Sequence, residues 1–429
     1  MKKVKDLLFS MQLTGMLLVV FGVVIAVATF IENDFGTRAA KVLVYNSKWF
    51  EFLLLLIAVN MLGTIIVRKM YRREKLTIFV FHIAFIVIIL GAGITRFFGF
   101  EGSMHIREGK SSNSMLSTTQ YLTVEMEQDG KNFIAEKEYM AAPVRSNRLK
   151  MKIKLNDHHI VVKSKEFIPN AYETLVESPD GKTIMHLVLF DGVERQDLFI
   201  PKGEIREAAG LRFSLDSKEE ADVKVFTSDT GNYFTSNNIT GWYNMMRDTG
   251  GQIYPDTLVP FQKMMIYNIG DIKFVMDKLL PSAKVELKSA GKEARHYDAV
   301  LVDVDVDGIV KEAVLYHVPG NYGKRVKLKF DNLMLTLSYG AKTLYLPFEL
   351  KLNDFILERY PGSESPSSFT SVVTLMDKER NINRETKIFM NNVLNHRGYR
   401  FFQSSYDKDE KGTILSVNHD FWGTTVTYL

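Results

Sequence analysis

The sequence contains no cysteine among its 429 residues. This absence excludes disulfides, thiolate metal sites and redox dithiols, and without a CxxCH motif the chain cannot itself carry a c-type haem. It is compatible with a location outside the cytoplasm but does not establish one. Neither sign of charge predominates, because 54 Lys and Arg residues and 50 Asp and Glu residues leave a net charge of only +4. We therefore expect no nucleic-acid partner.

Three dense apolar runs occupy the first hundred residues, whereas the rest of the chain is mixed sequence typical of soluble domains. The runs extend from about 7 to 31, from about 50 to 67 and from about 76 to 98. Each is near or above the roughly 18 to 20 residues that a helix needs to cross a bilayer. The first is too long for a removable signal peptide and lacks its small-residue cleavage site. Residues 1–98 are therefore predicted to form a transmembrane domain of three helices.

The charges that flank these runs predict their orientation. Two basic clusters lie before the first run and between the second and third, formed by Lys2, Lys3, Lys5, Arg68, Lys69, Arg72, Arg73 and Lys75. The loop at 32–49 carries only three cations, and Glu32 and Asp34 offset them. The positive-inside rule places the amino terminus and the 68–75 turn in the cytoplasm, with everything after about Phe98 outside.

A single histidine, His82, lies inside the third run, where an ionisable side chain is costly in hydrocarbon. At 1.5 Å per residue, His82 lies about 9 Å, and Asn60 of the second run about 10 Å, from the cytoplasmic ends of their helices. A membrane histidine that binds a metal usually donates from its other ring nitrogen to an acceptor. We therefore predict that the Asn60 amide carbonyl accepts a hydrogen bond from His82.

Three readings of His82 remain open on the residues alone. It could form a hydrogen bond across a helix pair. It could relay protons in a transporter, although such folds usually show repeats and interrupted helices that this sequence lacks. It could also be a ligand to a cofactor embedded in the membrane.

From Met104 onward the pattern changes to alternating strands separated by turn residues. Residues 121–139, YLTVEMEQDGKNFIAEKEY, place Asp-Gly between two alternating runs, and residues 150–167, KMKIKLNDHHIVVKSKEF, do the same with Asn-Asp. Helical periodicity appears only locally, at about 240–247 and 260–278. The pattern predicts a mainly antiparallel β domain at 99–429, and the Asn-, Gly-, Asp- and Thr-rich stretch near 235–260 is a candidate junction between two lobes.

Several motifs of the chain do not meet the requirements of the sites that they resemble. DVDVDG, at 303–308, begins like a calcium loop, but Val314 stands where a bidentate glutamate is needed. The alternation predicts instead a strand with its valines buried. His158 and His159 are adjacent at a hairpin bend, so their side chains point apart and do not suit one metal. The glycines of LGAGITR, Gly91 and Gly93, are expected to permit close helix packing. We find no candidate catalytic residue.

Four blocks of the sequence together resemble the ResB-like family of cytochrome c biogenesis proteins, and they cover both ends of the chain. They are FSMQLTGMLLVVFGVVIAVATFIENDFGTRAAKVLVYNSKWFEFLLLLIAVNMLG (9–63), FHIAFIVIILGAGITRFFGFEGSMHIREG (81–109), LPFELKLNDFILERYPGSESPSSFTS (346–371) and GYRFFQSSYDKDEKGTILSV (398–417). The resemblance implies a role in the System II pathway, which moves haem outward across the membrane and attaches it to apocytochrome c.

The resemblance also implies that His82, in FHIAF, is the family's intramembrane haem ligand. A neutral imidazole is a standard axial ligand of haem iron, here a haem b in transit. Arg68 and Arg72 are the expected contacts of its propionates. His105 lies beyond the third run, too far away to share the iron with His82, so the second axial ligand must come from elsewhere.

In the family, a tryptophan-rich partner, separate or fused at the carboxyl end, supplies the other membrane histidine. This chain has only three scattered tryptophans, Trp49, Trp242 and Trp422. It ends at HDFWGTTVTYL, where relatives normally enter a further membrane helix, so we expect either a piece of a fused synthase or a divided gene. In both cases this chain holds half of a haem site.

The sequence thus predicts a haem-handling subunit in a bacterial inner membrane, in contact with lipid, haem, the tryptophan-rich partner and apocytochrome c. Its large β domain would lie in the periplasm. We expect no catalysis by this chain alone, since thioether formation would be performed by the assembled synthase. The alternative is a membrane-tethered scaffold or binding module without a cofactor.

Overall fold

The computed structural model describes residues 7–128, 130–143, 148–192, 195–229, 231–291, 297–331 and 333–428. Lys2, Lys3 and Lys5, which contribute to the predicted orientation, lie outside these residues. The chain divides into two compact units. Unit 1 comprises residues 1–169 and 297–429, and unit 2 comprises residues 170–296.

Among the described residues, three helices of unit 1 are long and apolar enough to cross a membrane, which confirms the predicted spans. They are α2 (Met11–Phe35), α4 (Lys48–Val67) and α5 (Leu76–Phe98). Serine hydroxyls cap the first two, since Ser10 accepts from the backbone at the start of α2 and Ser47 does so for α4. Helix α2 continues beyond the predicted end near Ile31 until Gly36, whose φ of +84° breaks the helical backbone.

Short helical turns connect the three spans. Between α2 and α4 lie α3 (Thr37–Ala40) and the π-helical turn η1 (Lys41–Tyr45), and the 3-10 turn η2 (Arg73–Lys75) leads into α5. A buried apolar cluster packs α2 and η1 against α4, and its members include Leu17, Ala28, Val44, Phe50, Leu53 and Ile57. The three predicted apolar runs therefore form a helical bundle in which α4 is the most buried span.

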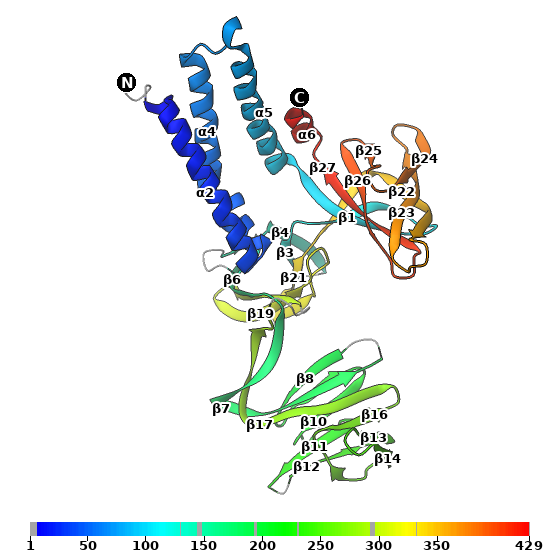
Figure 1. The fold of residues 1–429 in the computed structure, drawn as a ribbon. Coiled ribbons are helices and arrows are strands. Elements are labelled where there is room, and N and C mark those ends of the chain that lie inside the picture. Colours follow the sequence, from blue (N-terminus) through cyan, green and yellow to red (C-terminus); the bar gives the residue numbers. More distant parts are fainter. Residues whose placement is uncertain are drawn as a thin grey trace. The chain divides into compact units, whose positions relative to one another are not determined.

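The chain passes directly from α5 into an eight-stranded antiparallel sheet with the order β24-β23-β22-β2-β1-β27-β26-β25 (Figure 1). Its strands are β1 (Phe100–Arg107), β2 (Ser111–Ser117), β22 (Thr343–Arg359), β23 (Pro366–Asp377), β24 (Ile382–Ile388), β25 (Leu394–His396), β26 (Tyr399–Tyr406) and β27 (Gly412–His419). Strand β1 pairs with β27 from Phe100, opposite His419, to Arg107, opposite Gly412. The sheet thereby brings the end of the third span next to the carboxyl end of the chain.

Two four-stranded sheets complete the β structure of unit 1, and they share one apolar core. One has the order β19-β18-β6-β5 and the other β20-β21-β3-β4. Their strands are β3 (Tyr121–Gln128), β4 (Lys131–Glu138), β5 (Lys150–Leu155), β6 (His158–Ile168), β18 (Asp298–Val306), β19 (Ile309–His317), β20 (Val326–Phe330) and β21 (Leu333–Gly340). The pairs β3–β4 and β5–β6 are the two predicted hairpins.

Unit 2 is a sandwich of a six-stranded sheet, β14-β13-β16-β17-β7-β8, and a five-stranded sheet, β15-β12-β11-β10-β9. Its strands are β7 (Ala171–Phe190), β8 (Arg195–Pro201), β9 (Ile205–Ala208), β10 (Leu211–Leu215), β11 (Val223–Ser228), β12 (Gly231–Ser236), β13 (Thr240–Asn244), β14 (Thr249–Ile253), β15 (Val259–Pro260), β16 (Met265–Ile269) and β17 (Ile272–Ser289). The only parallel pair among the described strands is β10 with β11.

The division of the β region differs from the predicted one. The stretch near 235–260 lies inside unit 2, where its Gly- and Asn-rich segments turn between β12 and β15 instead of separating two lobes. The division falls at 169/170 and 296/297, because the long strands β7 and β17 pair with each other and carry the chain into and out of unit 2. The local helical periodicity at 240–247 and 260–278 is likewise overridden by strand pairing in β13, β16 and β17.

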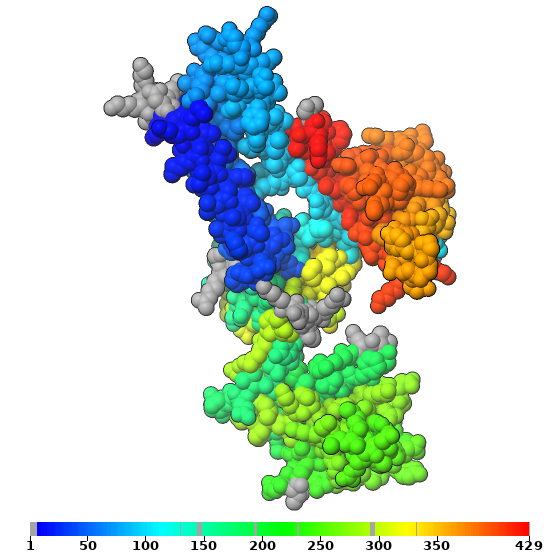
Figure 2. Space-filling view, in the orientation of Figure 1, coloured from blue at the N-terminus to red at the C-terminus, as the bar shows by residue number. Residues whose placement is uncertain are grey.

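A short carboxyl-terminal helix, α6 (Phe421–Thr427), packs against α5 and is the red segment beside that helix in Figure 2. The contact is close at two glycines. A Cβ at Gly91 would lie 2.0 Å from Thr427 Oγ1, and one at Gly423 would lie 2.2 Å from Thr95 Oγ1. The predicted packing role is confirmed for Gly91, whereas a Cβ at Gly93 would meet nothing within 4 Å.

Candidate functional site

Asn60 is fully buried on the face of α4 that meets α2. The Thr14 hydroxyl donates to its amide oxygen at 2.7 Å, and its amide nitrogen donates to the Leu8 carbonyl at 2.7 Å. One turn later Thr64 donates to the Phe9 carbonyl at 3.3 Å. These bonds tie the start of α2 to α4, so the Asn60 amide is engaged with α2 and not with His82.

His82 lies on α5, six residues after the helix begins, and its ring is partly exposed. Its Nδ1 is 2.8 Å from the carbonyl oxygen of Ile78, one turn earlier on the same helix. A carbonyl only accepts, so Nδ1 carries a proton, and in the neutral ring Nε2 is the nitrogen with the lone pair. In the described part of the chain, Nε2 has no hydrogen-bond partner.

The surroundings of His82 are apolar and open. Phe81 contacts the imidazole edge-on at 5.9 Å between ring centroids and also packs edge-on against Phe85. Only 6% of the most apolar stretch of the third span is buried within the chain, against 44% for α4. The α5 surface is therefore available to lipid or to helices of another protein.

Arg68 and Arg72 lie in the turn between α4 and α5, and both are exposed. Arg68 is the C-cap of α4, and Arg72 immediately precedes η2. Neither guanidinium forms an ion pair with any residue that the structure describes. Together with Lys69 they make the turn between α4 and α5 strongly basic, as its sequence indicates.

Several other histidines bind carboxylates. His105 on β1 lies 2.9 Å from Asp407, and His158 lies 2.6 Å from Asp307. Hydrogen bonds from the His159 backbone N–H and from His158 lower the pKa of the Asp307 carboxyl. No group of three or more candidate metal ligands occurs among the residues described. In β18 the alternating valines are buried, in agreement with the strand predicted for DVDVDG.

A partly buried ionic cluster that the sequence did not indicate involves Arg38, one of the three cations of the 32–49 loop. Arg38, on α3, pairs with Asp298 of β18 at 2.9 Å. His317 of β19 lies beside them with no exposed surface, and its Nε2 is 3.8 Å from Asp298, too far for a hydrogen bond. Burial, and then the positive charge of Arg38, lower the pKa of His317 to about 4. No sequence signal links these three positions, because only the tertiary fold brings them together.

These features define a class of protein: a membrane-anchored chain with a partly exposed imidazole in its third span and large antiparallel β units. The model of the ResB-like family matches residues 71–186 and 314–427. The chain therefore belongs to the ResB-like family, and this membership supports a role in cytochrome c biogenesis.

A curated relative, Protein NrfI of Wolinella succinogenes, is 32% identical over 423 residues. The alignment covers 99% of this chain and 33% of that protein, so the chain spans about a third of the relative's length. Unit 2 is mostly absent from the family match, which ends at residue 186 and resumes at 314. The helices from residue 71 onward and the eight-stranded sheet thus carry most of the family signature.

Proposed function

We propose that this chain is the haem-handling membrane subunit of a System II cytochrome c biogenesis complex, with His82 as an axial ligand to haem b in transit. The observation that carries the proposal is the bond from His82 Nδ1 to the Ile78 carbonyl. Such a bond fixes the tautomer and the ring orientation and leaves Nε2 as the metal-binding nitrogen. Ligation would also compensate for the cost of an imidazole in hydrocarbon.

The exposed basic turn supports the same assignment. Haem propionates need water or cations, and Arg68 and Arg72 offer unpaired guanidinium groups at the end of the hairpin nearest to His82. Asn60 has a different role in this proposal, because its amide is used to hold α2 against α4.

The site on this chain is half of a haem site. The open surface of α5 would receive a helix of the tryptophan-rich partner, which would supply the second axial histidine. When bound, haem provides the iron and the vinyl groups that the assembled complex joins to the CxxCH thiols of apocytochrome c. The β units would lie in the periplasm of a bacterium, where they keep the acceptor near the attachment site.

The proposed orientation can be checked by surface labelling, since the chain has no native cysteine. A Tyr71→Cys variant should react with a membrane-impermeant thiol reagent only after the inner membrane is opened. A Tyr322→Cys variant, in unit 1, should react in intact spheroplasts, because both side chains are exposed. The reverse pattern would contradict the orientation.

A second candidate function is a membrane-tethered scaffold without a cofactor. The same bond favours it in one respect, since a histidine that donates to its own helix needs no metal to satisfy Nδ1. The two functions differ in what Nε2 does, and this difference can be measured.

The test is the absorbance of the purified complex, coexpressed with its partner. His82→Ala should remove or strongly reduce the Soret band, whereas His105→Ala, outside the spans, should leave it unchanged. Imidazole added to His82→Gly should restore the band if ligation is the whole role of the residue. A complex that keeps an unaltered Soret band without His82, or that purifies colourless, would favour the scaffold.

A further inference from the structure

Strand β14 (Thr249–Ile253) is an outer strand of unit 2, because it pairs with β13 on one side only (Figure 1). The pairing runs in continuous register from Thr249, opposite Asn244, to Ile253, opposite Thr240. Four of the five residues of β14 are exposed. In the described part of the chain, the main-chain groups on the other side of β14 therefore face no partner strand.

The other outer strands of the molecule are protected against pairing with a further strand. Natural sheet edges are blunted by charged side chains, by proline or by shortness. The five sheets have two edges each, so the structure describes ten outer strands. Seven of the ten contain charged residues, and they are β4, β5, β8, β9, β19, β20 and β24. Two more, β15 and β25, are only two and three residues long.

Strand β14 has none of these protections. Its sequence is TGGQI, which has five residues and contains neither a charged residue nor proline. Glycine in a strand often marks a place where another backbone approaches closely. Among the described strands, β14 is therefore the one edge that is open to another backbone.

The two glycines of β14 also leave aromatic rings of β13 uncovered beside this edge. Gly251 lies opposite Trp242, and a Cβ at Gly251 would be 2.9 Å from the indole Nε1. Gly250 lies opposite Tyr243, and a Cβ at Gly250 would be 3.6 Å from a ring carbon of Tyr243. Successive residues of a strand point to opposite faces, so one ring lies over a glycine on each face of the sheet.

These features define the chemistry of the ligand. Free main-chain groups along a regular strand fit an extended polypeptide, which adds itself to the sheet as a further strand. The uncharged edge favours an uncharged segment, and the two rings favour apolar side chains on it. Met246, shortly before β14, and Tyr254, directly after it, add exposed apolar surface at both ends.

We infer that β14 is a docking site for an extended, uncharged segment of a different polypeptide, with Trp242 and Tyr243 as its side-chain contacts. A second copy of this chain fits less well. Two β14 strands in antiparallel pairing about Gly251 would place glycine opposite glycine, so no side chain would reach the rings.

The docking site is separate from the proposed haem site. His82 belongs to unit 1 and β14 to unit 2. Residues 249–253 also lie between the two segments that the family model matches, 71–186 and 314–427. The inference therefore goes beyond the proposed function and does not depend on it.

The experiment measures peptide binding to the purified full chain in detergent. The probe is a dye-labelled, end-blocked octapeptide of alternating threonine and valine, followed by fluorescence anisotropy. It should bind saturably, whereas the same peptide methylated on every backbone nitrogen should not bind, because it cannot donate hydrogen bonds to the edge. Bound peptide should slow hydrogen exchange within residues 249–253 and leave β8, the other edge of the same sheet, unchanged.

Substitutions locate the site. Gln252→Lys should abolish binding, because a charged side chain on an edge strand prevents pairing, and Gln252 is exposed, so the fold should persist by circular dichroism. Asn132→Lys, at an exposed position of edge strand β4, adds the same charge and is the matched control. Tyr243→Ala should weaken binding by about threefold, in the range of one lost cross-strand side-chain contact.

The other outcomes would overturn the inference. They are no binding of the probe to the wild-type chain, equal binding of the two peptides, and equal binding to wild type and Gln252→Lys. Dimerisation of the wild-type chain in analytical ultracentrifugation that is lost in Gln252→Lys, without peptide binding, would identify a second copy as the occupant. None of these results changes the test of His82, which uses haem and no peptide.

Discussion

Asn60 illustrates how one buried amide can set the position of a membrane helix. Counting residues places it at nearly the same depth as His82, yet the amide faces α2, where it bonds to Thr14 and Leu8. Depth follows from the helical rise, whereas the face depends on which helix packs closest. Sequence could therefore predict the position of Asn60 along its helix but not its partner.

Replacing Asn60 with leucine should destabilise the helical domain. The change removes the hydrogen bonds that the Asn60 amide forms with the Thr14 hydroxyl and the Leu8 carbonyl, each of which contributes about 0.5–1.5 kcal/mol. Thermal unfolding in detergent should show a lower midpoint for Asn60→Leu than for Asn33→Leu, at an exposed position near the end of α2. Equal midpoints would mean that the Asn60 bonds contribute no net stability.

His317 should make the stability of unit 1 depend on pH. Its pKa falls from the ordinary 6.5 to about 4 in the folded protein, because the ring is buried and lies near Arg38. Below pH 6.5 the His317 imidazole is protonated in the unfolded chain, whereas in the folded chain it stays neutral until about pH 4. The contribution of His317 to the free energy of unfolding should thus fall by up to about 3 kcal/mol over that interval and level off below it.

The measurement is the denaturation midpoint of the wild-type chain and of His317→Gln between pH 7 and pH 4. The variant should lose less stability than the wild type across this window, even if it starts from a lower value. His158→Gln, at a partly exposed histidine, provides the comparison. Parallel curves for wild type and His317→Gln would refute the assignment.

Among the secondary-structure elements, α6 offers the sharpest test, since its contact with α5 depends on a glycine. Gly91→Val should displace α6, because the new Cβ would lie 2.0 Å from Thr427 Oγ1. Gly93→Val is the matched control, with no atom within 4 Å of the new Cβ. Spin labels on Ala92→Cys and Thr425→Cys, both exposed, should report a broader distance distribution only in the Gly91 variant.

The outcome also bears on the cavity where α5 ends and α6 begins, because α6 supplies the aromatic side chains of Phe421 and Trp422 to its lining. If Gly91→Val leaves the label distances sharp, α6 is held mainly by the bond from Thr95 to Asp420, and the glycine contact is secondary.

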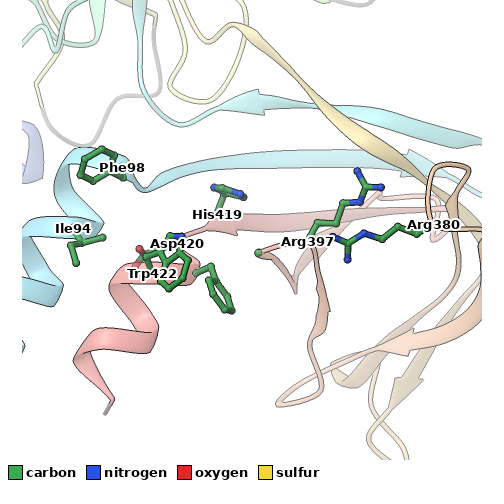
Figure 3. A pocket seen from close by; sticks show the side chains of 9 residues that line it. Ile94, Phe98, Arg380, Arg397, His419, Asp420 and Trp422 are labelled. Carbon is green, nitrogen blue, oxygen red and sulfur yellow. The ribbon is translucent and has the colours of Figure 1, made fainter.

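The same elements show what local sequence can and cannot predict. The spans and the hairpins β3–β4 and β5–β6 followed from apolar length, strand alternation and turn residues, all of which are local. The pairing of β1 with β27 could not be predicted, since it joins residues some three hundred positions apart along the chain. The residues that line the cavity where α5 ends and α6 begins come from both sides of that pairing (Figure 3). Arg380 and His419 therefore carried no sequence signal that would group them.

At the scale of the whole molecule, unit 2 is an insertion between two neighbouring strands of one sheet. Strands β6 and β18 are paired partners in unit 1, and the chain between them forms unit 2. The Asn170 carbonyl accepts from the Ala290 N–H at 3.0 Å, so the two ends of the insertion meet. The composition of the chain does not change where such an insertion begins and ends. The prediction from composition therefore assigned the junction to the loop-rich stretch at 235–260.

Removing the insertion should therefore leave unit 1 folded. Replacing residues 170–296 with a short Gly-Ser linker joins strand ends that already lie together, and the two four-stranded sheets keep their shared core. Unit 2, at about 130 residues and with a core of its own, should also fold when expressed alone. The shortened chain should keep the helical and β circular dichroism of unit 1 and the proposed His82-dependent Soret band, because His82, Arg68 and Arg72 all lie in unit 1. A shortened chain that folds but loses the Soret band would show that haem loading needs unit 2. A shortened chain that aggregates, together with an isolated unit 2 that does not fold, would refute the division into two units.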